Sequence, residues 1–149
     1  MSGQRTPPAA PGPVVAHRFL LALLHSPFGR LIGGLCELRF VGRASGRSIA
    51  LPVQCVREGT QLVIYVGHAS AKRWWRNFID GHSVQMLVAG VSYLGHGRAV
   101  DVGHPDRAWA ERTYHRRYPK VELLPIDPLV IIDLAAGTSE VSRDRVRGK

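Results

Sequence analysis

Short apolar stretches, each ended by a turn that contains glycine, dominate residues 36–134 and limit most strongly how the chain can fold. Apolar and polar residues alternate along 36–43, which is typical of a strand with one buried face. Two further stretches of this kind, 49–57 and 61–67, lie on either side of Gly59 and predict a hairpin. The first half of the body is therefore expected to be an antiparallel sheet.

The second half of the body repeats this pattern. Residues 83–89 and 91–102 predict a second hairpin, and the apolar run 128–134 predicts a buried strand. Gly95 and Gly97 fall inside a strand, where glycine indicates a bulge or the close approach of another backbone. Six strands joined mostly between neighbours predict an α+β, mainly β fold: a six-stranded, mostly antiparallel β-barrel with an N-terminal helix and short peripheral helices.

Helices are expected only around this barrel. The proline-rich residues 1–13 predict a disordered leader, and residues 14–149 a single domain, because the chain is long enough for one core. An apolar face predicts a helix over 14–24 that packs on the body or on a partner subunit. Contact of this helix with a membrane surface is the minor alternative. Residues 104–118 predict a second helix, because Pro105 lies at its start.

The charge balance is strongly basic. Twenty Lys and Arg face eleven Asp and Glu, which gives a formal net charge of +9. Such a surface attracts anions, including phosphates, polycarboxylates, nucleic acids and anionic lipids. Only Lys72, Lys120 and Lys149 are lysines, and arginine suits forked contacts to phosphate and carboxylate. A bias in genomic base composition explains the same arginine excess equally well.

The two cysteines, Cys36 and Cys55, lie in apolar alternating stretches and match no metal or CxxC spacing. They are expected to be inert buried thiols in a cytoplasmic protein. The seven histidines form no metal-binding motif, so no metal site is expected. No apolar run is long enough for a membrane-spanning helix, and no secretory signal is recognised.

Residues 42–47, Gly-Arg-Ala-Ser-Gly-Arg, form a glycine-rich basic turn at the end of a predicted strand. The backbone N–H groups of such a turn, with the Ser45 hydroxyl and the guanidinium groups of Arg43 and Arg47, can bind an anion. Taken alone, an ordinary hairpin turn with solvated arginines is the better interpretation, because turns of this composition are common.

Residues 68–78, HASAKRWWRNF, combine two adjacent tryptophans with a lysine and two arginines, and we call them the tryptophan segment. A short helix ending near Gly81 is expected here. Adjacent Trp74 and Trp75 would point about 100° apart on a helix, so one can anchor the segment in the core while the other faces a cleft. A wholly buried aromatic anchor is the alternative.

The order of these features resembles that of the deazaflavin-dependent nitroreductase family, small split β-barrel proteins that use coenzyme F420. The resemblance runs from about Leu38 to Leu134 and lies in seven stretches: GRASGR (42–47), LPV (51–53), LVIYVG (62–67), KRWWRNF (72–78), GRAVDV (97–102), the Tyr118-Pro119 pair and PLVIID (128–133). No single motif is specific, and their joint order carries the resemblance. It implies a split barrel of the FMN-binding type.

The family's cofactor is a flat tricyclic ring on a ribityl chain with a phosphate and a glutamate tail, which agrees with a basic, aromatic site. By resemblance, the cofactor-binding residues fall into four groups: at the anionic end, Arg43, Ala44 and Ser45; along the ring, Leu51, Pro52 and Val53; at the ribityl-phosphate region, Gly67, His68 and Lys72; and on the far wall, Arg73, Trp74, Trp75 and Asn77.

The chain also departs from the family's pattern. Many relatives carry a second basic residue where this chain has Ala44, so we expect a weaker grip on phosphate or a shift of this grip to Arg47 and Arg73. Relatives that reduce nitro compounds often carry further tyrosines after the Tyr-Pro pair, and here only Tyr118 is retained. Quinones and other conjugated acceptors are therefore as plausible as nitro compounds.

The resulting hypothesis is an F420-dependent oxidoreductase that transfers a hydride to a conjugated acceptor such as a quinone or nitro compound. Tyr118 is the candidate proton donor, with a role as a core tyrosine at the helix end as its alternative. An FMN-binding split-barrel reductase is the second hypothesis. A basic nucleic-acid-binding barrel without catalysis is the third, although no RRM-like motif occurs. The expected partners are the cofactor and an organic substrate, with no nucleic acid, and a homodimer is left open.

Overall fold

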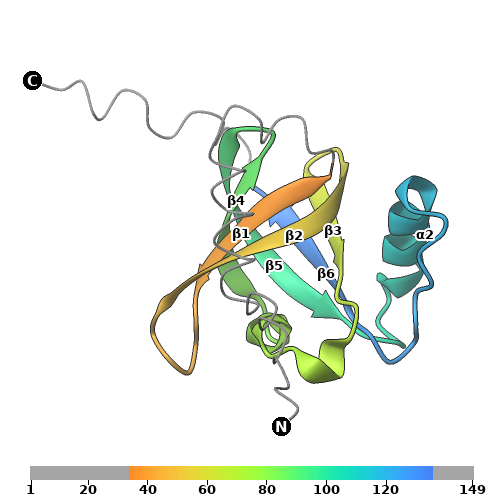
Figure 1. The fold of residues 1–149 in the computed structure, drawn as a ribbon, viewed down its shortest axis with the longest axis horizontal. Coiled ribbons are helices and arrows are strands. Elements are labelled where there is room, and N and C mark those ends of the chain that lie inside the picture. The colour runs from red at the N-terminus through yellow and green to blue at the C-terminus, as the bar shows by residue number, and fades with distance from the viewer. Residues whose placement is uncertain (1–33, 136–149) are drawn as a thin grey trace, which may run out of the picture.

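The computed structural model describes residues 34–135, which form a closed antiparallel barrel of six strands (Figure 1). The strands are β1 (Leu35–Val41), β2 (Ser48–Glu58), β3 (Gln61–Tyr65), β4 (His82–Val88), β5 (Val91–Val100) and β6 (Leu129–Leu134). Their order around the barrel is β1-β2-β3-β6-β5-β4, and all six pairings are antiparallel. The predicted mainly β barrel is thereby confirmed, with strand ends close to those expected from the alternation.

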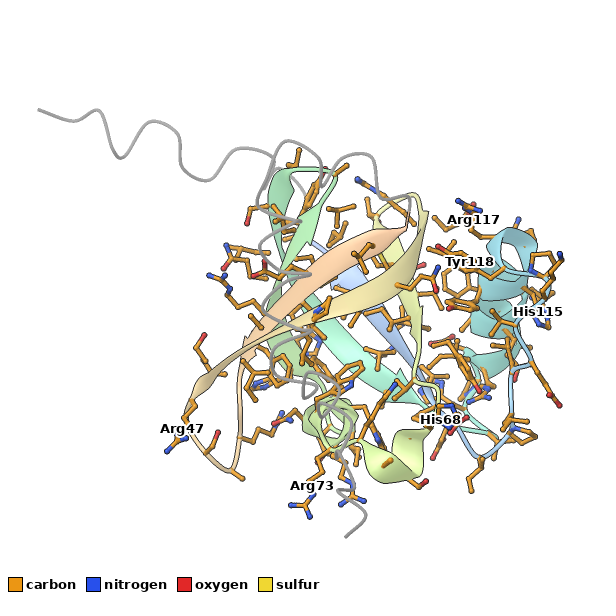
Figure 2. The ribbon with its side chains drawn as sticks, viewed as in Figure 1. Arg47, His68, Arg73, His115, Arg117 and Tyr118 are labelled. Atoms are coloured by element: carbon orange, nitrogen blue, oxygen red, sulfur yellow. A yellow bond between two sulfur atoms is a disulfide. The ribbon has the colours of Figure 1, made fainter. Side chains whose placement is uncertain are left out.

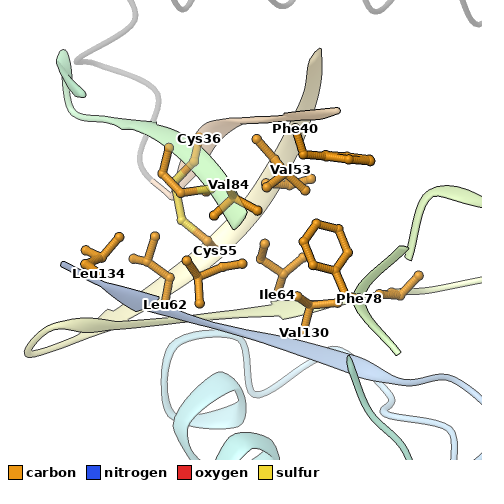
Figure 3. Packing of buried hydrophobic residues seen from close by; sticks show 14 of the residues in the cluster. Cys36, Phe40, Val53, Cys55, Leu62, Ile64, Phe78, Val84, Val130 and Leu134 are labelled. Atoms are coloured by element: carbon orange, nitrogen blue, oxygen red, sulfur yellow. A yellow bond between two sulfur atoms is a disulfide. The ribbon is translucent and has the colours of Figure 1, made fainter. Parts of the chain in front are cut away.

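The barrel interior is filled by the inward-facing half of each strand (Figure 3). On β1 the alternation places Cys36, Leu38 and Phe40 inside, each at most 4% exposed. Val130 and Ile132 of β6 lie in the same cluster. Burial of this apolar surface is the main favourable term in the stability of the fold.

Gly95 and Gly97 are positions of close approach on β5, as their place inside a strand predicts. A Cβ atom at Gly97 would lie 2.7 Å from Cδ1 of Phe78 and 2.8 Å from Cδ1 of Ile132. At Gly95 it would lie 2.8 Å from the carbonyl oxygen of Asp133. The absence of a side chain at Gly97 therefore lets the fully buried Phe78 ring dock against the barrel wall.

Among the described residues, one α-helix, α2 (Arg107–Arg117), covers the outside of the barrel at β2, β3 and β6. Its buried residues Ala110 and Tyr114 pack with Val63, Leu129 and Ile131 in a second apolar cluster. The sheet is therefore buried on both faces here. The predicted helix over 104–118 is confirmed, but it begins after Asp106 rather than at Pro105.

The helix predicted in the tryptophan segment is present as two 3₁₀-helices, η2 (Ala69–Ala71) and η3 (Trp74–Phe78). The predicted leader 1–13 and the predicted helix over 14–24 lie outside the described residues. Within residues 34–135, no helix combines the length and the apolar character needed to cross a membrane.

The two cysteines form a disulfide, so the expectation of two free thiols was wrong. The β1–β2 register places Cys36 opposite Val53, and Cys55 follows two residues later on the same inner face. The two Cα atoms are 6.5 Å apart, within the reach of a disulfide. Alternation predicted both side chains inside, but only the register brings them together. The cytoplasmic location stays a prediction, and this bond bears against it, because structural disulfides are rare in reducing compartments.

We expect the purified, unreduced protein to contain no titratable thiol after denaturation and to weigh less than the reduced chain by two hydrogen atoms. The disulfide closes a loop with a sequence separation of 19 residues. Replacing both cysteines by alanine should therefore lower the free energy of unfolding by about 3 kcal/mol, measured by chemical denaturation. Two reactive thiols in the denatured, unreduced protein would contradict the bond.

Candidate ligand-binding site

The ladder between β2 and β3 covers only part of β2, so the closed barrel has a stretch of open edge on this strand. Strand β2 pairs with β1 from Ser48 to Gln54, but it pairs with β3 only from Cys55 to Glu58. The N–H of Cys55 donates to Gly34 of the β1 side, so by alternation the backbone groups of Ala50, Pro52 and Gln54 point away from β1. Among the described residues, no strand pairs with Ala50 and Pro52 on this edge, whereas Gln54 adjoins the first β2–β3 pair, Cys55 with Ile64. Proline lacks the N–H that a partner strand would need, which suits an unpaired edge.

The basic turn at residues 42–47 is fastened to the tryptophan segment by Arg43 and Asn77, and we call this pair the latch. The backbone N–H of Arg43 donates to Oδ1 of Asn77 (2.9 Å), and Nε of Arg43 donates to the Asn77 carbonyl oxygen (3.1 Å). Nη2 of Arg43 donates to the carbonyl oxygen of Gly81. Asn77 in turn donates from Nδ2 to the carbonyl oxygen of Trp74 (2.9 Å). The Arg43 guanidinium therefore joins the basic turn to the tryptophan segment, and its contact with an anion stays a prediction.

The chain between Tyr65 and the latch accordingly runs from one end of the open edge to the other. Both tryptophans in it are half-buried and pack against the barrel core. The Trp74 ring meets the Phe78 ring edge-on at 6.1 Å, which fits the predicted anchor. Nε1 of Trp75 donates to the carbonyl oxygen of Ala69 (2.9 Å), so its single polar atom is satisfied inside the segment. What Trp75 offers a ligand is therefore the surface of its ring, over which the Arg76 guanidinium lies at 5.8 Å.

The predicted ring-contact residues on β2 do not all face the same way. Val53 is buried in the barrel core, and Leu51 packs against that core from the same inner face. Pro52 alternates with them and faces outward. A ligand at the open edge would thus meet the Pro52 side chain and the strand backbone.

Besides Arg43 of the latch, four cations around the tryptophan segment and the basic turn are exposed: Arg47, Lys72, Arg73 and Arg76. The ion pairs formed within residues 34–135 include none of them. Figure 2 shows Arg47, Arg73 and His68 along the lower side of the barrel. Ala44 and Ser45 are exposed in the turn, where Ser45 Oγ accepts the N–H of Arg47 (3.2 Å), and Gly67 is half-buried beside His68. This end of the barrel therefore presents uncompensated positive charge.

Tyr118 lies at the other end of β1 from the basic turn (Figure 2). Its hydroxyl is buried against Gly34, next to the first residue of β1, and among the described residues it has no hydrogen-bond partner. Seven residues of extended strand separate the two ends, roughly 20 Å. The structure thus brings together the latch and the tryptophan segment and leaves Tyr118 apart from them. Its role as proton donor stays a prediction.

Asp127 is a buried carboxylate that the sequence did not single out, and it binds the main chain at the start of the tryptophan segment. Its Oδ1 accepts the N–H of Ala69 (3.0 Å) and its Oδ2 accepts the Tyr65 hydroxyl proton (2.8 Å). Burial alone would raise the pKa of Asp127, but these hydrogen bonds and the N–H of His68 outweigh it and hold the pKa below its usual value. The sequence signal was one acidic residue between Pro125 and the last strand, which suggests a loop rather than a buried site.

Arg107 fixes the main chain around Asp127. It is 5% exposed, and Nη1 donates to the carbonyl oxygens of Asp127 (2.8 Å) and Val100 (3.2 Å). Nε donates to Oε1 of Glu111 (2.7 Å) one turn later on α2. A buried guanidinium with these partners is a structural element, not a ligand-binding one.

A separate surface hollow of about 540 Å³ lies on α2. Its lining residues are Trp109, Glu111, Arg112, Thr113, His115 and Arg116. Figure 1 shows α2 on the opposite side of the barrel from the β1–β2 turn, so this hollow is distinct from the candidate site.

We expect the latch to hold the tryptophan segment in place. Arg43→Ala and Asn77→Ala should each lower the free energy of unfolding by about 1–2 kcal/mol, because each leaves hydrogen-bonding groups without partners. The double variant should lose less than the sum of the two, since both remove the same contacts. Chemical denaturation measures all three. Arg47→Ala, in the same turn but without a side-chain contact, is the matched control and should stay within about 0.5 kcal/mol of wild type. Equal effects of Arg43→Ala and Arg47→Ala would refute the latch.

Comparisons with known proteins identify the fold. No protein-family model matches the chain, and no curated protein sequence matches it. Among solved structures, HupZ of Group A Streptococcus has a TM-score of 0.53 at 12% identity, covering 76% of this chain and 94% of that one. A Lactobacillus delbrueckii protein assigned provisionally as a pyridoxamine 5′-phosphate oxidase has a TM-score of 0.50 at 16% identity, covering 72% and 85%. A protein described as a domain-swapped dimer has a TM-score of 0.55 at 14% identity, covering 68% and 81%. At these identities the similarity shows the fold alone: a mainly β split barrel of six antiparallel strands.

Proposed function

We propose that this protein is an oxidoreductase that binds a flat, anionic redox cofactor at the open edge of β2. Coenzyme F420 is the favoured cofactor, and FMN is the second candidate. The split-barrel fold supports this proposal, because it is shared with a protein assigned provisionally as a pyridoxamine 5′-phosphate oxidase. The resemblance of residues 42–47 and 72–78 to the F420-using family favours the deazaflavin.

The proposal rests on one combination: part of the β2 edge has no partner strand, and the chain that runs from one end of this edge to the other carries exposed cations and a half-buried indole. The backbone groups of Ala50 and Pro52 that point away from β1 lie in the plane of the sheet, and no strand of residues 34–135 pairs with them. Trp75 supplies ring surface, and Lys72 and Arg73 supply charge that no carboxylate of residues 34–135 neutralises. These three elements fit a ligand that is planar at one end and anionic at the other.

Each group of residues would have a definite task. Lys72, Arg73 and Arg47 would bind the anionic arm, with the N–H groups of Ala44 and Ser45 as further donors. The backbone at Pro52 would orient the edge of the ring, and Trp75 would cover it and exclude water. Arg43 and Asn77 would act indirectly, because their hydrogen bonds hold the tryptophan segment in position. Gly67 and His68 would border the arm where β3 ends.

The cofactor, when bound, supplies hydride transfer to an electron-poor conjugated substrate such as a quinone or a nitro compound. The chain's own task is then to exclude water and to hold the substrate against the cofactor ring. No acid or base of the chain is needed at the hydride-transfer step itself. Proton donation by Tyr118, a homodimeric assembly, a cytoplasmic location and membrane contact by residues 14–24 stay predictions.

The direct test is titration of the ligand-free protein with oxidised F420, FMN, riboflavin and a random single-stranded oligonucleotide, followed by tryptophan fluorescence. We expect F420 to bind most tightly and FMN to bind better than riboflavin, because riboflavin has the ring but lacks the phosphate. Reduced F420 should then be oxidised in the presence of a quinone. Quenching by the oligonucleotide alone, with steep salt dependence, would instead indicate a nucleic-acid-binding barrel.

Two substitutions test the assigned roles. Trp75→Ala should weaken binding by about 1 kcal/mol through lost ring contact, and Lys72→Gln with Arg73→Gln should weaken binding of FMN but not of riboflavin. Arg112→Gln, an exposed arginine on α2, is the matched control and should change neither. Absence of any binding by the wild-type protein would disprove the proposed function.

A further inference from the structure

Ala69 connects the Trp75 side chain to the interior of the fold. Its carbonyl oxygen accepts the indole N–H of Trp75 (2.9 Å), and its own N–H donates to Oδ1 of Asp127 (3.0 Å). Ala69 is itself 2% exposed, so it cannot shift without disturbing the core. The position of the indole therefore depends on the position of Ala69.

The residue before Ala69 is held in a disfavoured conformation. His68 has φ 55° and ψ 44°, the left-handed region, although it is not a glycine. Its conformation directs the chain from the end of β3 into η2. No side chain caps η2 at His68. Another contact must therefore hold this turn against relaxation.

Asp127 provides that contact. Its carboxylate receives the N–H of Ala69 immediately after His68, and it is fixed on the other side by the Tyr65 hydroxyl (2.8 Å). The Tyr65 oxygen also accepts the N–H of Leu124 (3.1 Å), which anchors the ring to the loop before β6. The N–H of Val66 donates to the carbonyl oxygen of Pro128 (3.0 Å), so both ends of the turn are tied to the start of β6.

We propose that Asp127 is a positioning residue for the ligand site: it holds the strained His68 turn and, through Ala69, sets the orientation of the Trp75 indole. It touches no ligand. Its consequence for binding rests on the proposed function, in which Trp75 covers the cofactor ring. The positioning itself is a property of the ligand-free protein and is measured there.

The test uses the indole N–H resonances of the ligand-free, full-length protein. The chain has three tryptophans, and Trp→Phe substitutions assign their signals. In Asp127→Ala we expect the Trp75 indole signal to move toward that of a water-exposed indole. Its hydrogen exchange should accelerate about five-fold, the factor that loss of one ordinary hydrogen bond produces. The Trp109 signal, on α2, should not move.

Asp133→Asn is the matched control. Asp133 also lies on the β6 side, but its carboxylate binds Gln61 and Arg98 on the outer surface. This variant should leave the Trp75 signal in place. An equal movement of the Trp75 and Trp109 signals in Asp127→Ala would indicate general loosening and would overturn the proposal.

A second substitution separates positioning from simple loss of stability. Glycine adopts the left-handed conformation without a steric penalty. Adding His68→Gly to Asp127→Ala should therefore return the Trp75 signal most of the way to its wild-type position. If His68→Gly restores nothing, Asp127 does not act through this turn and the proposal fails.

Two further outcomes complete the test. If Asp127→Ala does not fold, Tyr65→Phe takes its place, because it removes one hydrogen bond to the carboxylate. This variant should move the Trp75 signal by a smaller amount. An unmoved signal would overturn the proposal. If the wild-type protein binds F420 or FMN, Asp127→Ala should bind it about five-fold more weakly. If the wild-type protein binds neither, the proposed function fails while the movement of the Trp75 signal still supports the positioning role.

Discussion

The unequal length of two neighbouring strands determines the rest of this structure. Strand β2 has eleven residues and β3 has five, so the ladder between them ends while β2 still continues. An unpaired edge in an otherwise closed barrel must be covered by chain, solvent or ligand, because its backbone groups need partners. The chain between β3 and β4 does not form another strand there, and it instead carries two 3₁₀-helices and both adjacent tryptophans.

This connecting chain is fixed at three points by different kinds of interaction. Phe78 anchors it through burial in the barrel, where Gly97 leaves space for the ring. Arg43 fixes its far end through hydrogen bonds to carbonyl oxygens, and Asp127 fixes its near end through the N–H of Ala69. Between these points the Trp75 ring stays half-exposed. A rigid frame around a partly accessible ring suits recognition of a flat ligand, because little conformational freedom is lost on binding.

The sequence predicted the strands well because alternation and turn glycines are local signals that do not depend on register. It also indicated close packing at Gly97. It could not predict the disulfide or the latch, because Cys36 meets Cys55, and Arg43 meets Asn77, only after the strands have paired. The same limit applies to Leu51 and Val53, because only the folded barrel shows that Val53 lies in the core and that Leu51 packs against it. Asp127 gave no signal because a single acidic residue beside prolines looks like an ordinary loop.

The disulfide between Cys36 and Cys55 encloses the basic turn at residues 42–47 in a covalent ring. This turn is the most exposed part of the hairpin, with residues 43–48 all accessible to solvent. A protease that cuts once within the turn would open the ring but release no fragment, because both new ends stay joined through sulfur. Only a reducing agent would then separate the two pieces. The hairpin that carries the candidate anion-binding groups is thus built to survive a single break in its backbone.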